Sequence, residues 1–266
     1  MTNLTVTLAF LLSAPALLAF QPKATLNCNN DHGDNGRAHF CEMREQTVPV
    51  NGMISVDART NGGISVKGWN RADVLVRAQV RTTAPTEDQA KDLARQINIQ
   101  TSGTTRANGP SPDGNSDRSW SVSYEVFVPS RFSVTLETVN GGVSISDVSG
   151  NLEFKTVNGG LSLHRINGYV HGRTTNGGVS IELAGDRWDG QGLDVTTTNG
   201  GVSLRVPQNY SAQLEAHTNN GRIRAEAVTV QQSQPDRQNH ISTALGTGGA
   251  MLKVTTTNGG VSLSRI

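Results

Sequence analysis

The sequence lacks a strong charge of either sign. Its 266 residues carry 23 Lys and Arg against 22 Asp and Glu, which leaves a net charge of +1, and no long run of basic residues occurs. A protein that binds nucleic acid usually gathers a basic excess on one face. Nucleic acid is therefore not an expected partner.

Long apolar segments are missing too, apart from one at the N-terminus. Residues 8–18 form an apolar run with small residues at Ala14, Ala16 and Ala19, although no Lys or Arg precedes it. The pattern predicts a secretory signal over residues 1–19. A buried strand or helix of the mature protein is the alternative. The run is too short to span a bilayer, and no later segment is apolar enough, so we expect an exported protein of the periplasm or cell surface without a transmembrane span.

Common catalytic motifs are absent from the sequence. Gly-x-Ser-x-Gly, His-Glu-x-x-His and phosphate-loop patterns do not occur, so no catalytic residue, cofactor or metal site is predicted. Residues 113–117 begin like a calcium loop, but Arg118 and Tyr124 stand where that loop needs Gly and Glu. A solvated loop is favoured there.

One aspartate cluster is a weak candidate for binding or chemistry. Asp186, Asp189 and Asp194 surround Trp188, and paired carboxylates beside an aromatic ring suit sugar chemistry. The competing interpretation is an insertion that bulges out of a repeat and packs its tryptophan. Asp186, Trp188 and Asp189 are kept as weak binding candidates.

Cysteine is scarce, with only Cys28 and Cys41. An even count in an exported protein favours a disulfide. The alternatives are free thiols or a zinc set completed by His32 and His39, although that spacing is not a common zinc-finger spacing. The disulfide would lie in an N-terminal segment, residues 20–46, ahead of the repeats.

Glycine is abundant, with 29 residues, and it recurs in an Asn-Gly-Gly signature. Self-similarity of this kind indicates a repeat architecture, and Asn and Gly tolerate the left-handed backbone that tight corners require. The predicted turn asparagines, including one degenerate Asn-Gly-Arg copy, are Asn61, Asn140, Asn158, Asn176, Asn199, Asn220 and Asn258.

Residues on both sides of each signature alternate with a period of two, which indicates strands. Around Asn158, for example, Leu152, Phe154, Leu161 and Leu163 are apolar and their neighbours are polar. A serine column lies four residues after the Asn, on the polar side: Ser65, Ser144, Ser162, Ser180, Ser203 and Ser262.

A threonine column shares the phase of the apolar positions, two residues before each Asn. We therefore expect these hydroxyls to point inward and, with the Asn amides, to form ladders that satisfy the corner backbone. Like residues on like residues favour a β-solenoid with parallel pairing; an antiparallel meander of Asn-Gly hairpins is the alternative. The column is Thr138, Thr156, Thr174, Thr197, Thr218 and Thr256.

The remaining segments predict one helix among longer strands. Residues 72–81 and 120–128 alternate as strands do, and Thr86-Glu-Asp-Gln89 is a capping box that opens an amphipathic helix over about residues 86–98. Residues 103–119 are rich in Gly, Pro, Asp and Asn and predict a mobile loop, and residues 231–240 predict another insertion. The fold class is thus all-β, a β-solenoid or β-helix-like stack with one inserted helix.

These residues carry a family resemblance. Thr60-Asn-Gly-Gly-Ile-Ser-Val-Lys-Gly-Trp69, the capped helix, Trp120-Ser-Val-Ser-Tyr-Glu-Val, the Thr-x-Asn-Gly-Gly units and Gly185-Asp-Arg-Trp-Asp-Gly190 together resemble the bacterial putative adhesin family, domain of unknown function 4097. The resemblance covers residues 47–266, which we take as one repeat domain. It implies an exported, non-enzymatic, adhesin-like envelope or surface protein that presents a solenoid face to protein or polysaccharide. The alternatives are a polysaccharide-processing β-helix enzyme and an accessory of an envelope-stress response.

Overall fold

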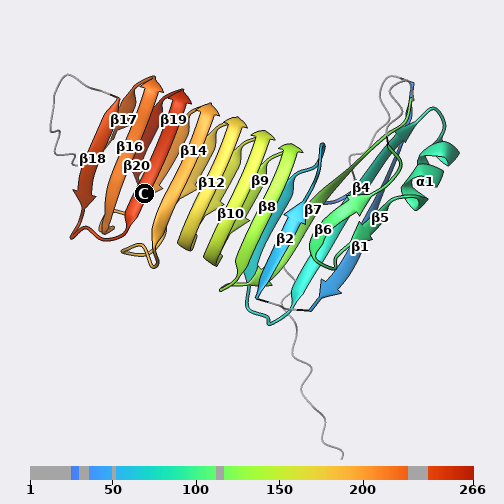
Figure 1. Ribbon diagram of the computed structural model, residues 1–266, viewed down its shortest axis with the longest axis horizontal. Coiled ribbons are helices and arrows are strands. Elements are labelled where there is room, and N and C mark those ends of the chain that lie inside the picture. Colours follow the sequence, from blue (N-terminus) through green and yellow to red (C-terminus); the bar gives the residue numbers. More distant parts are fainter. Residues whose placement is uncertain (1–24, 30–35, 50–51, 112–116, 227–238) are drawn as a thin grey trace, which may run out of the picture.

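The computed structural model describes residues 25–29, 36–49, 52–111, 117–226 and 239–266 (Figure 1). The predicted signal over residues 1–19 lies outside these residues, as do His32 and most of the insertion expected at 231–240. Two ten-stranded sheets lie face to face and enclose one apolar core.

The first sheet, called sheet A, contains the strand that follows each Asn-Gly-Gly signature. Its order is β1 (Ala38–Val48), β4 (Val74–Ala84), β7 (Ser119–Pro129), β3 (Ile64–Trp69), β9 (Val143–Ser146), β11 (Leu161–His164), β13 (Val179–Glu182), β15 (Val202–Val206), β20 (Val261–Arg265) and β17 (Ile223–Ala225).

The second sheet, called sheet B, contains the strand that precedes each signature. Its order is β18 (His240–Leu245), β16 (Ala212–Asn220), β19 (Met251–Asn258), β14 (Gly192–Asn199), β12 (Asn167–Asn176), β10 (Ser149–Asn158), β8 (Ser133–Asn140), β2 (Met53–Asp57), β6 (Thr104–Asn108) and β5 (Asn98–Gln100).

Successive coils pair in parallel, which confirms the solenoid and excludes the meander. Strand β10 pairs in parallel with β8 and β12, and its Asn158 lies in register with Asn140 and Asn176. Antiparallel pairs occur only towards the ends of the described sheets, in β1–β4–β7, β5–β6 and β16–β18. Because each coil repeats the same pattern, parallel register places apolar residues on apolar residues.

The last coil of the chain is not the last coil of the stack. Strands β19 and β20 fill the space between the coil of β14 and β15 and the coil of β16 and β17 (Figure 1). The chain therefore skips one position after Asn199, forms the outer coil first, and returns to fill the gap.

The core follows the predicted columns. The apolar residues on both sides of Asn158 are buried, and all six threonines of the predicted column are buried. Gly172 interrupts the apolar column. The ring of Phe154 in the neighbouring coil occupies the space that a side chain at Gly172 would need, since a Cβ there would lie 1.9 Å from a ring carbon.

The inserted helix is shorter than predicted. Helix α1 spans Glu87–Arg95, Gln96 caps its end, and strand β5 begins at Asn98, so the expected end near residue 98 is wrong. The hydroxyl of Thr86 accepts a hydrogen bond from the backbone N–H of Gln89, as the capping box predicts. The helix packs on β1 and β4 at the N-terminal end of the stack (Figure 1).

The mobile loop expected over residues 103–119 is also wrong in part. Thr104–Asn108 form strand β6, which pairs in parallel with β2. The composition of residues 103–119 favoured a loop because the strand within it is only five residues long. In that strand the buried Thr105 and Ala107 alternate with more exposed residues.

The glycines of the signature serve close packing rather than a left-handed backbone. None of the Asn or Gly residues of the signatures has a positive φ, which corrects the reason given above; Gly150 and Gly168, at the second corner, do. A Cβ on the first glycine would collide with the neighbouring coil: on Gly159 it would lie 1.9 Å from the carbonyl oxygen of Gly141. The second glycine has more room, since a Cβ on Gly160 would lie 3.3 Å from the nearest carbonyl oxygen.

Two hydrogen-bond ladders tie the coils together at this corner. The Thr156 hydroxyl donates to the carbonyl oxygen of Gly141 at 2.8 Å, and the contact recurs along the threonine column. The Asn158 amide donates to Asn140 Oδ1 at 2.7 Å and accepts from Asn176 Nδ2 at 2.8 Å. The threonines thus satisfy the corner backbone, as predicted, whereas the asparagine amides bond to one another.

Replacing Asn158 with alanine should lower the free energy of unfolding by about 1 kcal/mol, because two hydrogen bonds at an exposed corner are lost. Urea denaturation of the two proteins measures the change. Asn61→Ala is the matched control, since the side chain of Asn61 accepts only one ladder bond, from Asn140. An unchanged midpoint for Asn158→Ala would show that the ladder contributes nothing.

Candidate functional site: the outer face of sheet A

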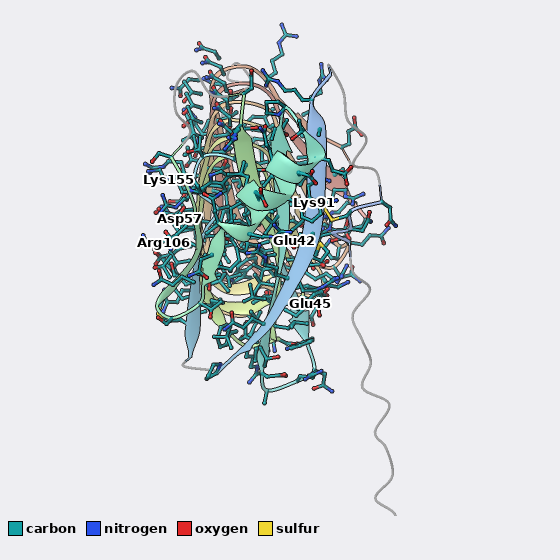
Figure 2. The ribbon with its side chains drawn as sticks, turned by 90° about the vertical axis from the view of Figure 1, so that its right-hand side faces the viewer. Glu42, Glu45, Asp57, Lys91, Arg106 and Lys155 are labelled. Carbon is teal, nitrogen blue, oxygen red and sulfur yellow. A yellow bond between two sulfur atoms is a disulfide. The ribbon has the colours of Figure 1, made fainter. Side chains whose placement is uncertain are left out.

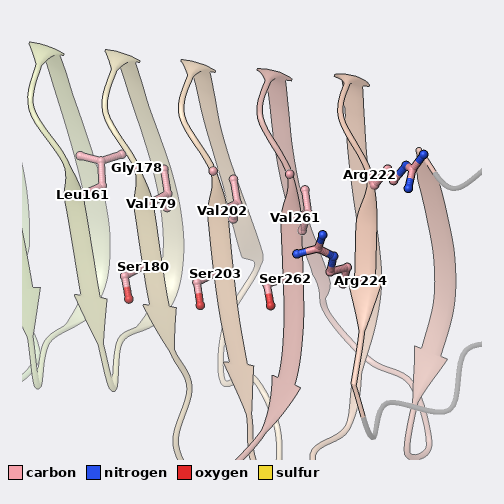
Figure 3. Close-up of a pocket in the computed structure, with 12 residues that line it drawn as sticks. Leu161, Gly178, Val179, Ser180, Val202, Ser203, Arg222, Arg224, Val261 and Ser262 are labelled. Atoms are coloured by element: carbon pink, nitrogen blue, oxygen red, sulfur yellow. The ribbon is translucent and has the colours of Figure 1, made fainter.

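The outer face of sheet A carries two rows of very small residues. One row is the second glycine of each signature: Gly63, Gly142, Gly160, Gly178, Gly201 and Gly260. The other is the serine column, which parallel register places strand beside strand, as in Ser144, Ser162 and Ser180. Figure 3 shows Ser180, Ser203 and Ser262 aligned on neighbouring strands.

The two rows form a shallow trough across the strands of sheet A. A hollow of about 640 Å³ lies over β13, β15 and β20 and is lined by residues of both rows. A second hollow of about 430 Å³ lies over β3, β9 and β11. Leu161 lines both hollows, so the trough continues from β3 to the C-terminal edge. We call it the Gly/Ser trough.

Two arginines occupy the C-terminal end of the trough. Arg222 and Arg224 belong to the degenerate Asn-Gly-Arg coil and replace the glycine and the serine of the two rows, since Arg224 is in register with Ser262. Both are exposed, and neither has an ion-pair partner within the described residues. Arg224 extends towards strand β20 (Figure 3). This end of the trough therefore carries two guanidinium groups that no described carboxylate contacts within ion-pair distance.

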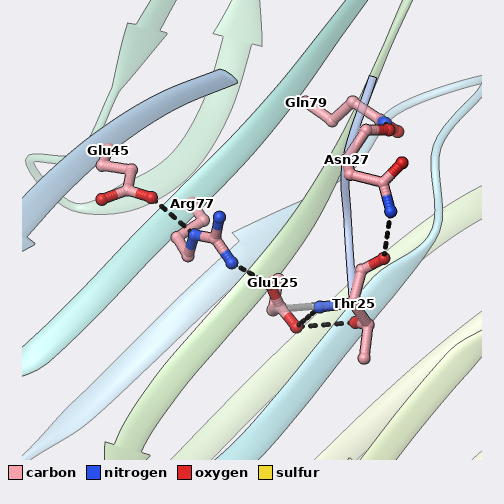
Figure 4. Close-up of polar contacts among 6 residues, drawn as sticks. All are labelled: Thr25, Asn27, Glu45, Arg77, Gln79 and Glu125. Atoms are coloured by element: carbon pink, nitrogen blue, oxygen red, sulfur yellow. Dashed lines mark hydrogen bonds and ion pairs between the residues drawn. The ribbon is translucent and has the colours of Figure 1, made fainter. Parts of the chain in front are cut away.

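A segment of the chain itself covers the N-terminal continuation of the same face. Residues 25–29, called the strap, cross β7 and β4 without helix or strand structure. The backbone N–H and the hydroxyl of Thr25 donate to Glu125 Oε1 at 2.9 and 2.6 Å, and Gln79 Nε2 donates to the carbonyl oxygen of Asn27 (Figure 4).

Glu125 continues the serine row, because it lies in register with Ser65. The strap leaves it only 2% exposed. Its other oxygen accepts a hydrogen bond from Arg77 Nη1 at 2.7 Å, and Arg77 Nε donates to Glu45 at 2.7 Å (Figure 4). A buried carboxylate needs such partners because desolvation of an unpaired charge is costly. Glu125 is thus paired on one side with sheet A and on the other with the strap.

A disulfide fixes the strap to the edge of sheet A. Cys28 and Cys41 are bonded, with Cα atoms 5.6 Å apart, and Cys41 lies on β1. The bond confirms the predicted pairing and leaves no thiolate for the zinc set. The boundary expected between residues 46 and 47 falls inside β1, which pairs along its length with β4.

The outer face of sheet B differs in chemistry from the trough. Charged residues of both signs stand where sheet A has serines, and they include Asp57, Arg106 and Lys155 (Figure 2). A shallow hollow on that face is lined by long side chains such as Glu137, Glu153 and Arg173. Within the described residues, sheet A alone presents two continuous rows of small residues across its strands.

The aspartate cluster does not form a converging site in this structure. Trp188 is 5% exposed and its indole N–H donates to the carbonyl oxygen of Gly168 at 2.9 Å, so it packs as the insertion hypothesis expects. Asp186 and Asp189 are exposed. The pKa of the neighbouring Tyr210 is raised, mainly by burial and to a lesser extent by the charge of Asp186. Among the described residues, these carboxylates do not belong to any group of three that could hold a metal ion.

The other sequence candidates do not form a site within the described residues. Four residues of the calcium-like segment fall outside the described residues, and the fifth, Asp117, forms an ion pair with Arg37. Among the residues that the structure describes, no group of three His, Cys, Asp or Glu side chains could hold a metal ion. His164 contacts Ser162 Oγ at 3.0 Å at the border of the trough.

A family model matches more than half of the chain, residues 130–264, which contain the regular coils. The chain belongs to the Toastrack DUF4097 family. The family match is narrower than the resemblance over residues 47–266, and it leaves the strap and helix α1 outside. No curated protein matches this chain.

The solved structures that match this chain share little sequence with it. A putative cell adhesion protein from Clostridium sporogenes is 10% identical, with a TM-score of 0.48 over 85% of this chain and 100% of that chain. A putative adhesin from Bacteroides fragilis is 11% identical, with a TM-score of 0.38 over 85% of this chain and 97% of that chain.

Sequence reasoning missed the main features of this face. The serine column was correctly placed on the polar side, but the glycine row beside it was assigned to turn geometry. Arg222 was taken only as a degenerate copy. The available signal was the register: counting two and four residues past each Asn puts Arg222 and Arg224 in the same two rows.

Proposed function

We propose that this chain is an exported, non-catalytic protein of the bacterial envelope or cell surface that binds its partner in the Gly/Ser trough. In this proposal residues 1–19 are a cleaved signal, and the disulfide-linked N-terminal segment, residues 20–46, continues through β1 into the repeat domain, residues 47–266. The disulfide supports export, because such bonds persist in oxidising compartments. Within the described residues, no helix could cross a membrane.

The observation that carries the proposal is the glycine row. Packing excludes a side chain at the first glycine of each signature but constrains the second far less: a Cβ there would lie 3.2–3.6 Å from the nearest carbonyl oxygen, which asks the neighbour to shift by a few tenths of an ångström at most, and Arg222 occupies the equivalent place. Six repeats nevertheless carry glycine at this outward position. A row of side chains here would fill the trough, so the glycines keep it open.

An envelope-binding experiment tests the proposal. The full chain, produced in a bacterium, should appear in the periplasmic or surface fraction with the disulfide formed and the N-terminal signal removed. The purified protein should co-sediment with envelope fragments. Ser180→Glu adds bulk and negative charge to the trough at an exposed position, and should weaken co-sedimentation about tenfold.

Thr196→Glu is the matched control, because Thr196 lies on the outer face of sheet B in strand β14. It should bind envelope fragments as the unmodified protein does. Equal binding by all three proteins would show that the trough is not the binding surface, and cytoplasmic retention of the full chain would overturn export.

A further inference from the structure

We infer that the Gly/Ser trough binds an extended polypeptide segment, with an acidic group of that segment at Arg222 and Arg224. The inference rests on the proposed function and names its ligand class. It comes from the strap, which is already a polypeptide lying on this face.

The strap shows how this face holds a peptide. It lies where the two rows continue beyond β3. Thr25 donates a hydrogen bond to Glu125, which belongs to the serine row. Asn27 accepts one from Gln79, which continues the glycine row because it lies opposite Ser123 on β7. Two of the three contacts use the backbone of the strap, its N–H at Thr25 and its carbonyl at Asn27. Backbone recognition accepts a peptide with little regard to its side chains.

The strap also leads into the open trough. Leu26 lines the hollow formed by Gly63, Ser65 and their neighbours on β9 and β11. The strap therefore occupies one end of a continuous groove whose remaining length, from β3 to β17, no described residue covers. Glycines give a bound backbone close access, and the serine hydroxyls both donate and accept hydrogen bonds.

The dimensions of the trough fix the length of the segment. Seven strands, β3 to β17, cross the trough, and neighbouring strands lie about 4.8 Å apart, which gives a length of roughly 29 Å. An extended peptide advances about 3.3–3.6 Å per residue. A segment of about eight or nine residues therefore spans the trough, and its acidic group reaches the two arginines, which pair well with carboxylates.

Selection from a library tests the inference. Phage-displayed random dodecapeptides are selected on the full chain, and the enriched sequences are synthesised with a fluorescent label. We expect enrichment of peptides with an acidic residue near one end. Their affinity, measured by fluorescence anisotropy, should fall at least tenfold with Ser180→Glu and remain unchanged with Thr196→Glu.

Two further measurements distinguish binding along the trough from non-specific peptide binding. Shortening a selected peptide to six residues should weaken binding at least tenfold, because it no longer spans the trough. The double variant Arg222→Ala, Arg224→Ala should bind peptides with an acidic end more weakly than the unmodified protein does. Peptides in which the acidic residue is replaced by a neutral one should bind the variant and the unmodified protein with equal affinity.

The failure of the inference differs from the failure of the proposed function. If Ser180→Glu weakens the binding of soluble cell-wall glycan strands but not of any peptide, the trough is a binding surface and the peptide inference is wrong. If Ser180→Glu changes the binding of neither peptides, glycan strands nor envelope fragments, the peptide inference and the proposed function are both wrong. Melting temperatures of the variants equal to that of the unmodified protein establish that they are folded.

Discussion

Replacing Gly159 with alanine should lower the free energy of unfolding by about 3 kcal/mol or more, the upper range for inserting an atom into a packed site. The new Cβ would lie 1.9 Å from the carbonyl oxygen of Gly141 and 2.4 Å from its carbonyl carbon. Both are backbone atoms held by the ladder, so neither can move aside without separating two coils. Denaturation in guanidinium chloride measures the change.

Gly160→Ala is the control one residue away. Its Cβ would lie 3.3 Å from the nearest carbonyl oxygen, a tight contact that a shift of a few tenths of an ångström relieves, and its φ is not in the left-handed region. We therefore expect a loss of about 1 kcal/mol or less. Equal effects of the two alanines would show that glycine is needed for backbone freedom at this corner rather than for close approach of the coils.

The second large effect concerns Phe154 and Gly172, which face each other in neighbouring coils. Gly172→Val should destabilise the protein by about 3 kcal/mol, because the added carbons meet a buried ring. Phe154→Leu should cost about 1–2 kcal/mol through the space it leaves. Together the two changes restore the ordinary pattern of an aliphatic column, so the double variant should be more stable than the sum of the single effects predicts.

A double-mutant cycle by urea denaturation tests this coupling. We expect a coupling energy of about 1–2 kcal/mol. Additive effects would mean that the ring of Phe154 does not depend on the missing side chain of Gly172, and that glycine at this position has another cause.

The trough and the ladder place different demands on the same seven-residue corner, from the threonine to the serine of each signature. The first glycine and the threonine are fixed by packing and by the hydrogen bond between coils. The second glycine and the serine face outward, and a side chain at the second glycine would meet the neighbouring coil much less closely than one at the first. The corner is therefore a structural element on its inner side, and its outer side is the surface to which we assign binding in the proposed function.

The alternation around each Asn determined the coils. Because side chains on a strand alternate between two faces, the apolar and threonine columns could be assigned to the core from the sequence alone, and all six threonines are buried as expected. Like residues at equal spacing also favoured parallel stacking. The disulfide followed from two cysteines in a chain expected to be exported.

The boundaries of the inserted elements were less predictable. The stripe of helix α1 continues to Ile97, but the helix ends at Arg95 because Gln96 caps it and β5 follows at once. Strand β6 has only five residues in a segment rich in loop-forming residues, and its pairing with β2 fixes it as a strand. Local composition gives no indication of that pairing.

The sequence by itself determined the unit of this protein, a coil of two short strands with a known inner and outer face. Only the tertiary structure decided the order of the coils, because every coil offers nearly the same surface to its neighbours. The coil of β19 and β20 lies between the coil of β14 and β15 and the coil of β16 and β17. Only the tertiary structure brought the strap onto Glu125, 100 residues away along the chain. It also joined six separate Gly and Ser pairs into one trough, since a row across strands exists only once the strands are paired.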